Sequence, residues 1–193
     1  MILKAYEISK INTNINKIIL FYGQNQGAKE EGISRLIDDK KENIIKYDEK
    51  QIIENQDIFY ENILSKSLFD ENKIVIINRA TDKIFKIIED LNENKLDDIL
   101  LIIEANNLDK KSKLRSFIEK SKSYICVPFY QDENSMLSKI FYNFLKENNL
   151  SISNENINLI LSRCNGDRGI LKNELNKIKF FSLKNKKLTT ENI

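Results

Sequence analysis

The chain has 193 residues, of which 41% are hydrophobic and 31% are charged, so it is long enough to bury a core as one or two domains. Its 31 basic and 29 acidic residues leave a net charge of +2, which gives no overall electrostatic footprint for DNA or an anionic membrane. The absence of histidine excludes His-based acid–base catalysis and the His-containing zinc sites.

Neither the N-terminus nor the cysteines point to an exported or metal-binding protein. The first residues are too polar for a signal peptide, and no apolar run is long enough to span a membrane. Cys126 and Cys164 are far apart in sequence and do not form a metal-type pair, so we expect both to be small buried apolar residues. The sequence therefore predicts a cytoplasmic protein with no membrane partner and no bound metal.

Apolar runs separated by helical patterns fill the first two thirds of the chain. The predicted strands are Lys17–Gly23, Asn43–Asp48, Lys73–Arg79, Asp98–Ala105 and Tyr124–Phe129. Helical patterns follow each of the first four strands: from Ala28, over Lys50–Lys66 as one or two helices, after a Thr81 cap, and from Leu108. Strands that alternate with helices predict βαβ units, hence an α/β fold with a parallel sheet covered on both faces.

The pattern changes to helices alone after Pro128. Three amphipathic helices are predicted over 134–149, 152–166 and 167–185, with Ser153 as a cap and Gly166 near a helix end. We place the boundary so that 1–132 form the α/β domain and 133–193 form a small helical domain. The last residues, 188–193, are predicted to start another helix, so we expect a further C-terminal domain to be missing from this chain.

The first strand leads into a segment with the context of a phosphate-binding loop but not its chemistry. A working loop has the form G-x-x-x-x-G-K-[ST] between a strand and a helix. Here Gly23 and Gly27 are one residue too close, Ala28 separates Lys29 from Gly27, and Glu30 stands where the hydroxyl is needed. A carboxylate facing a triphosphate opposes binding by charge repulsion. We therefore expect no nucleotide cofactor, and the simpler role for both glycines is turn geometry before a helix.

A second requirement for ATP hydrolysis also fails. ATPases of this shape carry acidic residues at a strand end for Mg²⁺ and water. The corresponding strand offers Glu104 without an Asp before it. The sequence predicts no catalytic residues.

Several stretches in order resemble the delta subunit of the bacterial DNA polymerase III clamp loader. They are ILFYGQNQGAKEEGISRLI at the degenerate loop, SKSLFDENKIVIINRA (65–80), DDILLIIEANNLDKKSKLRSFIEK (97–120) and CNGDRGILKNELNKIKFFS (164–182). The resemblance covers nearly the whole chain and implies an AAA+-like α/β domain followed by a helical lid. It also implies a protein that binds and opens the sliding clamp while other subunits bind ATP.

The resemblance also implies a contact site and partners. Leu68 and Phe69 match the hydrophobic pair that inserts into a pocket on the clamp, and Ser67, like Asp70, is expected to shape the turn. Two such side chains contribute roughly 3–5 kcal/mol when buried. The alternative is that both cover the sheet edge internally. The other loader subunits are expected to bind mainly through a collar domain absent here, and DNA is expected to be contacted indirectly.

Two arginines are not expected to act on nucleotides. Ser162-Arg163-Cys164 spells the arginine-finger triplet of ATP-dependent relatives but lies in the predicted lid, so we expect an exposed Arg163 beside a buried Cys164. Arg168 lies where relatives place a phosphate-sensing arginine, and a structural role is expected for it. A divergent P-loop ATPase and a non-catalytic AAA+-like scaffold with another partner stay as the alternative hypotheses.

Overall fold

The protein is described from a computed structural model, which covers residues 1–37, 43–65, 73–93 and 98–184. Its contacts divide the chain into two compact units. The first consists of Met1–Gly23 and Glu31–Phe129, and the second of Gln24–Glu30 and Tyr130–Ile193. The sequence predicted a division after residue 132, whereas the contacts divide the chain between Phe129 and Tyr130. The sequence carried no sign that residues 24–30 group with the helical unit.

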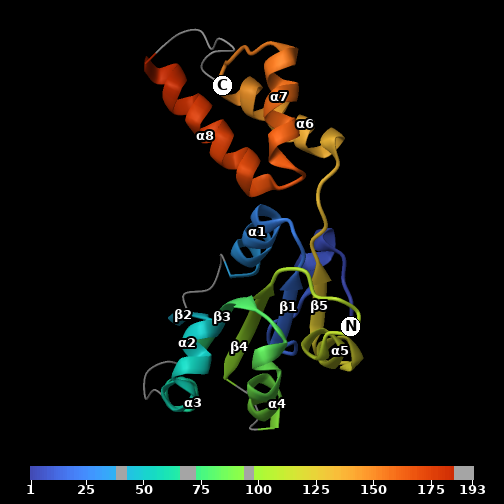
Figure 1. Cartoon of the computed structure of the whole chain (residues 1–193), viewed down its shortest axis with the longest axis vertical. Helices are drawn as coiled ribbons and strands as arrows, with labels where there is room; N and C mark the ends of the chain where they lie inside the picture. The colour runs from blue at the N-terminus through green and yellow to red at the C-terminus, as the bar shows by residue number, and fades with distance from the viewer. Residues whose placement is uncertain (38–42, 66–72, 94–97, 185–193) are drawn as a thin grey trace. The chain divides into compact units, whose positions relative to one another are not determined.

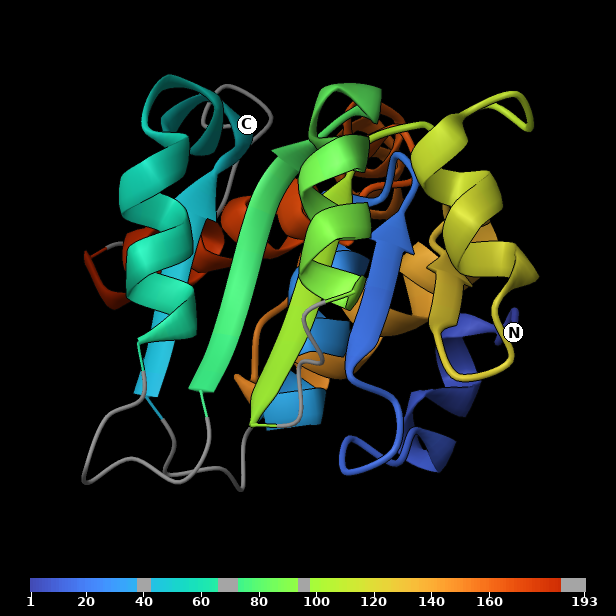
Figure 2. The ribbon, with the colours of Figure 1, turned by 90° about the horizontal axis from the view of Figure 1, so that it is seen from below.

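The first unit is built on a parallel sheet of five strands in the order β2-β3-β4-β1-β5 (Figures 1 and 2). The strands are β1 Ile18–Tyr22, β2 Asn43–Asp48, β3 Lys73–Ala80, β4 Ile99–Ala105 and β5 Ile125–Pro128. The predicted α/β fold is confirmed. Central strands β1 and β4 are buried at every residue, which explains their continuous apolar sequences, whereas β2 at the sheet edge is largely exposed or half-buried.

Helices cover both faces of this sheet. They are η1 Ala5–Lys10, α1 Gln26–Ile37, α2 Glu49–Glu54, α3 Gln56–Leu64, η2 Asp82–Ile84, α4 Phe85–Glu93 and α5 Lys113–Lys120. In Figure 2, α2, α3, α4 and α5 lie along one face of the strands. Their apolar residues, such as Ile52 and Leu114, share a core with Leu20 of β1, while Gly32 of α1 lies against Ile8 and Phe21 on the other face.

The local caps follow the sequence predictions. Thr81 caps η2 by accepting from the Lys83 amide at 3.3 Å, and residues 49–64 form the two helices α2 and α3. The N-terminal 3-10 helix η1 was not predicted. Its segment is tied to the sheet because Ile2 bridges to Cys126 and the Met1 ammonium donates to the carbonyls of Ser121 and Tyr124 at 2.9 and 2.8 Å.

In the second unit three helices, α6 Asn134–Glu147, α7 Asn154–Cys164 and α8 Arg168–Lys184, pack around an apolar core. Leu137, Phe141 and Leu171 at its centre are fully buried. Ser153 caps α7 as predicted, accepting from the Asn156 amide. The predicted helix start over 188–193 lies outside the described residues.

A tight turn leads from α7 into α8. Asn165 and Gly166 both have positive φ, 47° and 75°. A Cβ on Gly166 would lie 2.9 Å from the Asp132 carbonyl oxygen, so glycine is required both by the backbone conformation and by the close approach.

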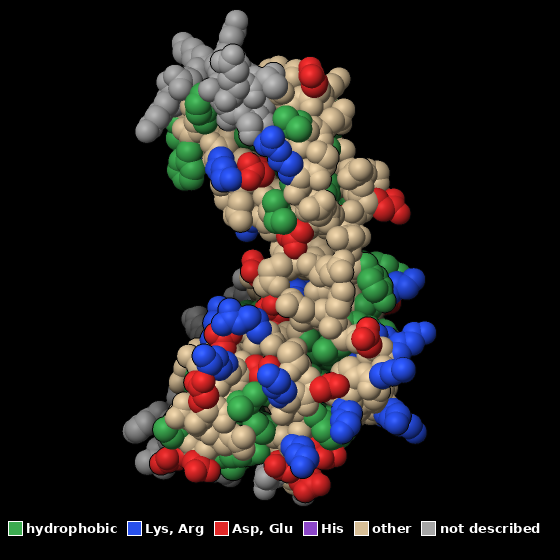
Figure 3. Space-filling model, in the orientation of Figure 1, with side chains coloured by type: hydrophobic (Ala, Val, Ile, Leu, Met, Phe, Trp, Pro, Cys, Tyr) green, Lys and Arg blue, Asp and Glu red, His purple; other side chains and the backbone are tan. Residues whose placement is uncertain are grey.

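The described residues contain no helix long and apolar enough to cross a bilayer. On the face in Figure 3, acidic and basic side chains intermingle over the protein. This agrees with the near-balance of charge in the sequence.

Candidate functional site

The residues predicted to contact the clamp, Ser67, Leu68 and Phe69, lie outside the described residues, as does Asp70. What the structure describes is the pair of residues that flank this segment. Lys73, the first residue of β3, donates from Nζ to the carbonyl oxygens of Ser65 at 2.5 Å and Asn62 at 3.1 Å. An ammonium at the last carbonyls of α3 favours that helix terminus. Lys73 therefore connects the start of β3 to the end of α3, the described residues on either side of 66–72.

The residues of the degenerate phosphate loop are described completely. Helix α1 begins at Gln26, two residues earlier than predicted, so Gly27 and Lys29 are helical. Gly23 has φ 128°, and a Cβ there would lie 2.1 Å from the Phe129 carbonyl oxygen. A Cβ on Gly27 would lie 1.9 Å from the Gly169 nitrogen. Close backbone contacts therefore require both glycines, in addition to the turn geometry that the sequence indicated for them.

The charged residues of this segment do not form an exposed phosphate cradle. The Lys29 side chain is fully buried, so its ammonium is not presented at the surface. The exposed Glu30 accepts from the Gln26 side chain at 3.1 Å. Glu104, the single acidic residue of its strand end, is 92% buried (8% exposed) and pairs in register with Phe21.

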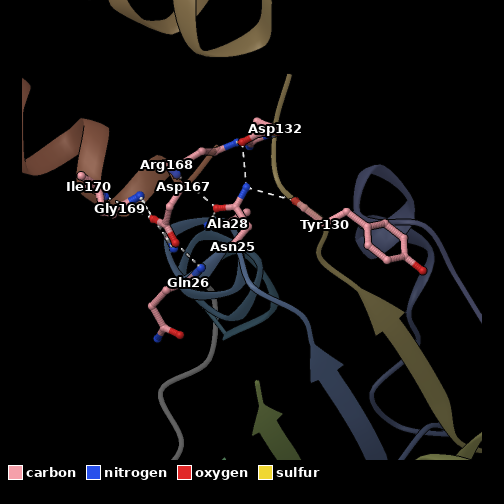
Figure 4. A network of polar contacts seen from close by, with 10 residues as sticks. Asn25, Gln26, Ala28, Tyr130, Asp132, Asp167, Arg168, Gly169 and Ile170 are labelled. Atoms are coloured by element: carbon pink, nitrogen blue, oxygen red, sulfur yellow. Dashed lines mark hydrogen bonds and ion pairs between the residues drawn. The ribbon is translucent and has the colours of Figure 1, made fainter. Parts of the chain in front are cut away.

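Two helix N-termini of the second unit share their capping side chains (Figure 4). Asp167 precedes α8 and accepts from the Gly169 and Ile170 amides at 2.6 and 3.2 Å. The same carboxylate accepts from the Gln26 and Gly27 amides of α1 at 2.6 and 3.3 Å. One carboxylate thus satisfies the first amides of two helices, which are normally left without intrahelical partners.

Asn25 has the reciprocal role at the start of α1. Its Oδ1 accepts from the Ala28 amide of its own helix and from the Arg168 amide of α8, both at 3.1 Å. Its Nδ2 donates to Asp132 at 2.8 Å and to the Tyr130 carbonyl at 3.3 Å. Asn25 is fully buried, and these four contacts satisfy the hydrogen-bonding groups of its side-chain amide.

Arg168 completes this network through its side chain. Its guanidinium donates from Nε to Oδ2 of Asp132 at 2.6 Å and from Nη2 to Oδ1 at 2.9 Å. A two-point contact of this kind fixes the orientation of the guanidinium plane relative to the carboxylate plane. Arg168 therefore has the structural role that was predicted, and Arg163 is exposed beside a fully buried Cys164, also as predicted.

A polar cleft of about 430 Å³ lies in the first unit beyond the ends of β3 and β4. Its lining includes Arg79, Lys83 and Lys111. Asp82 on the same cleft accepts from the Ser112 hydroxyl at 2.5 Å and from the Leu114 and Lys113 amides at 3.1 Å each. Burial opposes ionisation of Asp82, but these donors outweigh it and hold its pKa below the ordinary value. Asp82 thus acts as a cap for α5, a role that the sequence did not reveal.

Among the described residues, no group of His, Cys, Asp and Glu is arranged to hold a metal ion. Burial raises the pKa of the Cys126 thiol to about 12, so this thiol is a poor nucleophile at neutral pH.

Comparison with known proteins gives a family match and several similar structures. The family model described as "DNA polymerase III, delta subunit" matches residues 19–130. Among solved structures, the DNA clamp loader delta protein of Bacillus subtilis is similar with a TM-score of 0.53 and 15% identity. That match covers 97% of this chain and 59% of the other, so this chain spans little more than half of the length of the Bacillus subtilis protein.

A second kind of structure shares the fold. Domain III of the replication initiation protein DnaA from Thermotoga maritima is similar with a TM-score of 0.60 and 11% identity, over 97% of this chain and 85% of that one. AMPPCP-bound DnaA from Aquifex aeolicus is similar with a TM-score of 0.56 and 14% identity, over 94% of this chain and 62% of that one. At these identities the likeness concerns the fold, which is AAA+-like. Comparison with curated protein sequences gives no significant match.

Proposed function

The chain belongs to the DNA polymerase III delta subunit family, and we propose that it binds and opens the sliding clamp during DNA replication without hydrolysing ATP itself. The observation that carries the proposal is the family match over residues 19–130, which includes the Ser67–Leu68–Phe69 segment. In this proposal Leu68 and Phe69 are the apolar pair that enters a pocket on the clamp.

The anchored ends of that segment support the proposal. Lys73 contacts the carbonyls of Ser65 and Asn62, so the described residues that flank 66–72 are joined to each other beside the end of α3. A recognition segment with fixed ends loses less conformational entropy on binding than a free one. The same arrangement would be of less use if Leu68 and Phe69 only covered the sheet edge.

The absence of nucleotide chemistry is supported at the degenerate loop. The Gln26 and Gly27 amides, which start the helix after the loop, already donate to Asp167. The only lysine of the loop segment, Lys29, is fully buried. Both the donors and the cation that would hold phosphates are thus engaged inside the protein.

The family supports a further proposal about the partners. We place the protein in the cytoplasm, with the sliding clamp as its direct partner. The other clamp-loader subunits would be bound mainly by the part of the family's length that this chain does not span, and DNA would be reached through the assembled loader.

Calorimetry with the sliding clamp tests the proposal. The double variant Leu68→Ala/Phe69→Ala is expected to weaken binding about 100-fold or more, since each buried side chain contributes about 1.5–3 kcal/mol. The matched control is Ile53→Ala/Ile58→Ala, which removes two exposed apolar side chains from the neighbouring helices α2 and α3. Equal affinity of the double variant and the parent would refute the assigned contact.

A nucleotide titration tests the second half of the proposal. The parent protein is expected to show no micromolar ATP affinity. Such an affinity, lost in Lys29→Ala, would favour the divergent ATPase instead.

A further inference from the structure

The Asp167 carboxylate lies where two helix N-termini converge. Its Oδ2 accepts from the Gln26 amide at 2.6 Å, and its Oδ1 accepts from Gly27, Gly169 and Ile170 at 3.3, 2.6 and 3.2 Å. Figure 4 shows this side chain between the starts of α1 and α8. All of these residues belong to the second unit.

The backbone amides that Asp167 occupies are the kind of donor by which a strand–loop–helix segment binds phosphate. We propose that Asp167 is a built-in anion that permanently takes the place of a phosphate group at the N-terminus of α1 and locks the former nucleotide loop to α8. The inference deepens the proposed function, because it identifies the group that closes the loop to nucleotides.

Electrostatics explain why an anion is needed there. Each helix N-terminus carries about half of a positive elementary charge, so two termini brought together repel. A single carboxylate balances both and supplies an acceptor for four amides. The remaining charged pair, Arg168 and Asp132, is neutral in sum and leaves this balance unchanged.

Sterics and the second cap make the arrangement specific. The two helices approach through glycines at equivalent positions, two residues after the caps Asn25 and Asp167. A Cβ on Gly169 would lie 3.2 Å from the Cα of Gly27, and one on Gly27 would lie 1.9 Å from the Gly169 nitrogen. Asn25 repeats the pattern in the other direction, because its oxygen accepts from Ala28 and Arg168. The glycines and the two caps therefore form one lock, with Asp167 as its only charged cap.

Anion rescue tests the proposal. Asp167→Ala removes the carboxylate, and inorganic phosphate is then offered in its place. The thermal midpoint of each protein is compared in phosphate and in sodium chloride of equal ionic strength. The control is Ser153→Ala, which removes the cap of α7 alone. We expect phosphate to raise the midpoint of Asp167→Ala by about 3 °C more than that of the parent or of Ser153→Ala.

A second variant keeps the test valid if Asp167→Ala does not fold in either salt. Asp167→Asn retains one acceptor oxygen for α8 but directs an amide N–H at the Gln26 amide. Amide exchange followed by NMR is then expected to accelerate about tenfold or more at Gln26, with little change at Gly169.

The outcomes separate this inference from the proposed function. A phosphate response confined to Asp167→Ala, or faster exchange confined to Gln26 in Asp167→Asn, supports the lock. An equal phosphate response in the parent, no extra response in a folded Asp167→Ala, or unchanged exchange at Gln26 in Asp167→Asn overturns it. Clamp binding by the parent is measured separately and stands or falls with Leu68 and Phe69.

Discussion

The contact between Gly27 and Gly169 predicts a large effect of a single methyl group. In Gly27→Ala the added Cβ would lie 1.9 Å from the Gly169 nitrogen, 2.5 Å from its Cα and 2.7 Å from the Arg168 carbonyl carbon. All three are backbone atoms, so no side-chain rotation relieves the clash. The starts of α1 and α8 must separate by more than 1 Å, roughly, to restore ordinary contact distances.

That separation determines the magnitude. Overpacking alone costs about 1–3 kcal/mol. Lengthening the Gln26 and Gly27 bonds to Asp167 adds about 1.5–3 kcal/mol, since hydrogen bonds to charged groups are the stronger ones. The higher helix propensity of alanine offsets about 1 kcal/mol of this destabilisation. We therefore expect Gly27→Ala to destabilise the protein by about 3 kcal/mol.

Helix α1 contains its own control. A Cβ on Gly32 would lie 2.9 Å from Cδ1 of Ile8 and from Cζ of Phe129, which are side-chain atoms and can yield more easily than the backbone atoms that Gly27 meets. Gly32→Ala is therefore expected to change the free energy of unfolding by about 1 kcal/mol or less, because propensity and crowding nearly cancel. Urea unfolding followed by circular dichroism measures both. If the two variants have equal stability, the proposed backbone contact does not hold α1 to α8.

Three further predictions concern other parts of the molecule. Lys73→Met should weaken clamp binding several-fold in calorimetry without abolishing it, because the ends of residues 66–72 lose their anchor while the apolar pair remains; unchanged affinity would contradict the anchoring role. The folded-state pKa of Asp82 is lowered, so its contribution to stability is present above its unfolded pKa of about 3.9 and is lost as pH falls through the folded value. The difference in urea stability between the parent and Asp82→Asn should therefore be constant above about pH 5 and shrink below about pH 4, and a difference that grows in acid would have the wrong sign. Burial raises the pKa of both thiols, so Cys126 and Cys164 should resist alkylation at pH 8 in the folded protein and react fully in urea, as mass spectrometry would show; rapid labelling without urea would place a thiol at the surface.

The sequence by itself determined most of the fold because the signals are local. Strands β1 and β4 are buried on both faces, so they appear as unbroken apolar runs. The Ser153 cap stands directly before α7, and the apolar residues of α6 recur with helical spacing. The failure of the phosphate-loop spacing at Gly23, Gly27 and Lys29 is equally local. The Leu68–Phe69 contact came from resemblance and stays a prediction.

Only the tertiary structure decided what replaces the phosphate. Asp167 and Gln26 are 141 residues apart, and no local pattern connects them. The Asp82 cap of α5 was missed for the same reason, since it depends on contacts with Ser112, Lys113 and Leu114, about 30 residues away. Periodicity records which face of an element is buried but not which distant group covers it. The sequence thus predicted that the loop has no nucleotide chemistry, and the contact between the first residues of α1 and Asp167 supplied the carboxylate that occupies its amides.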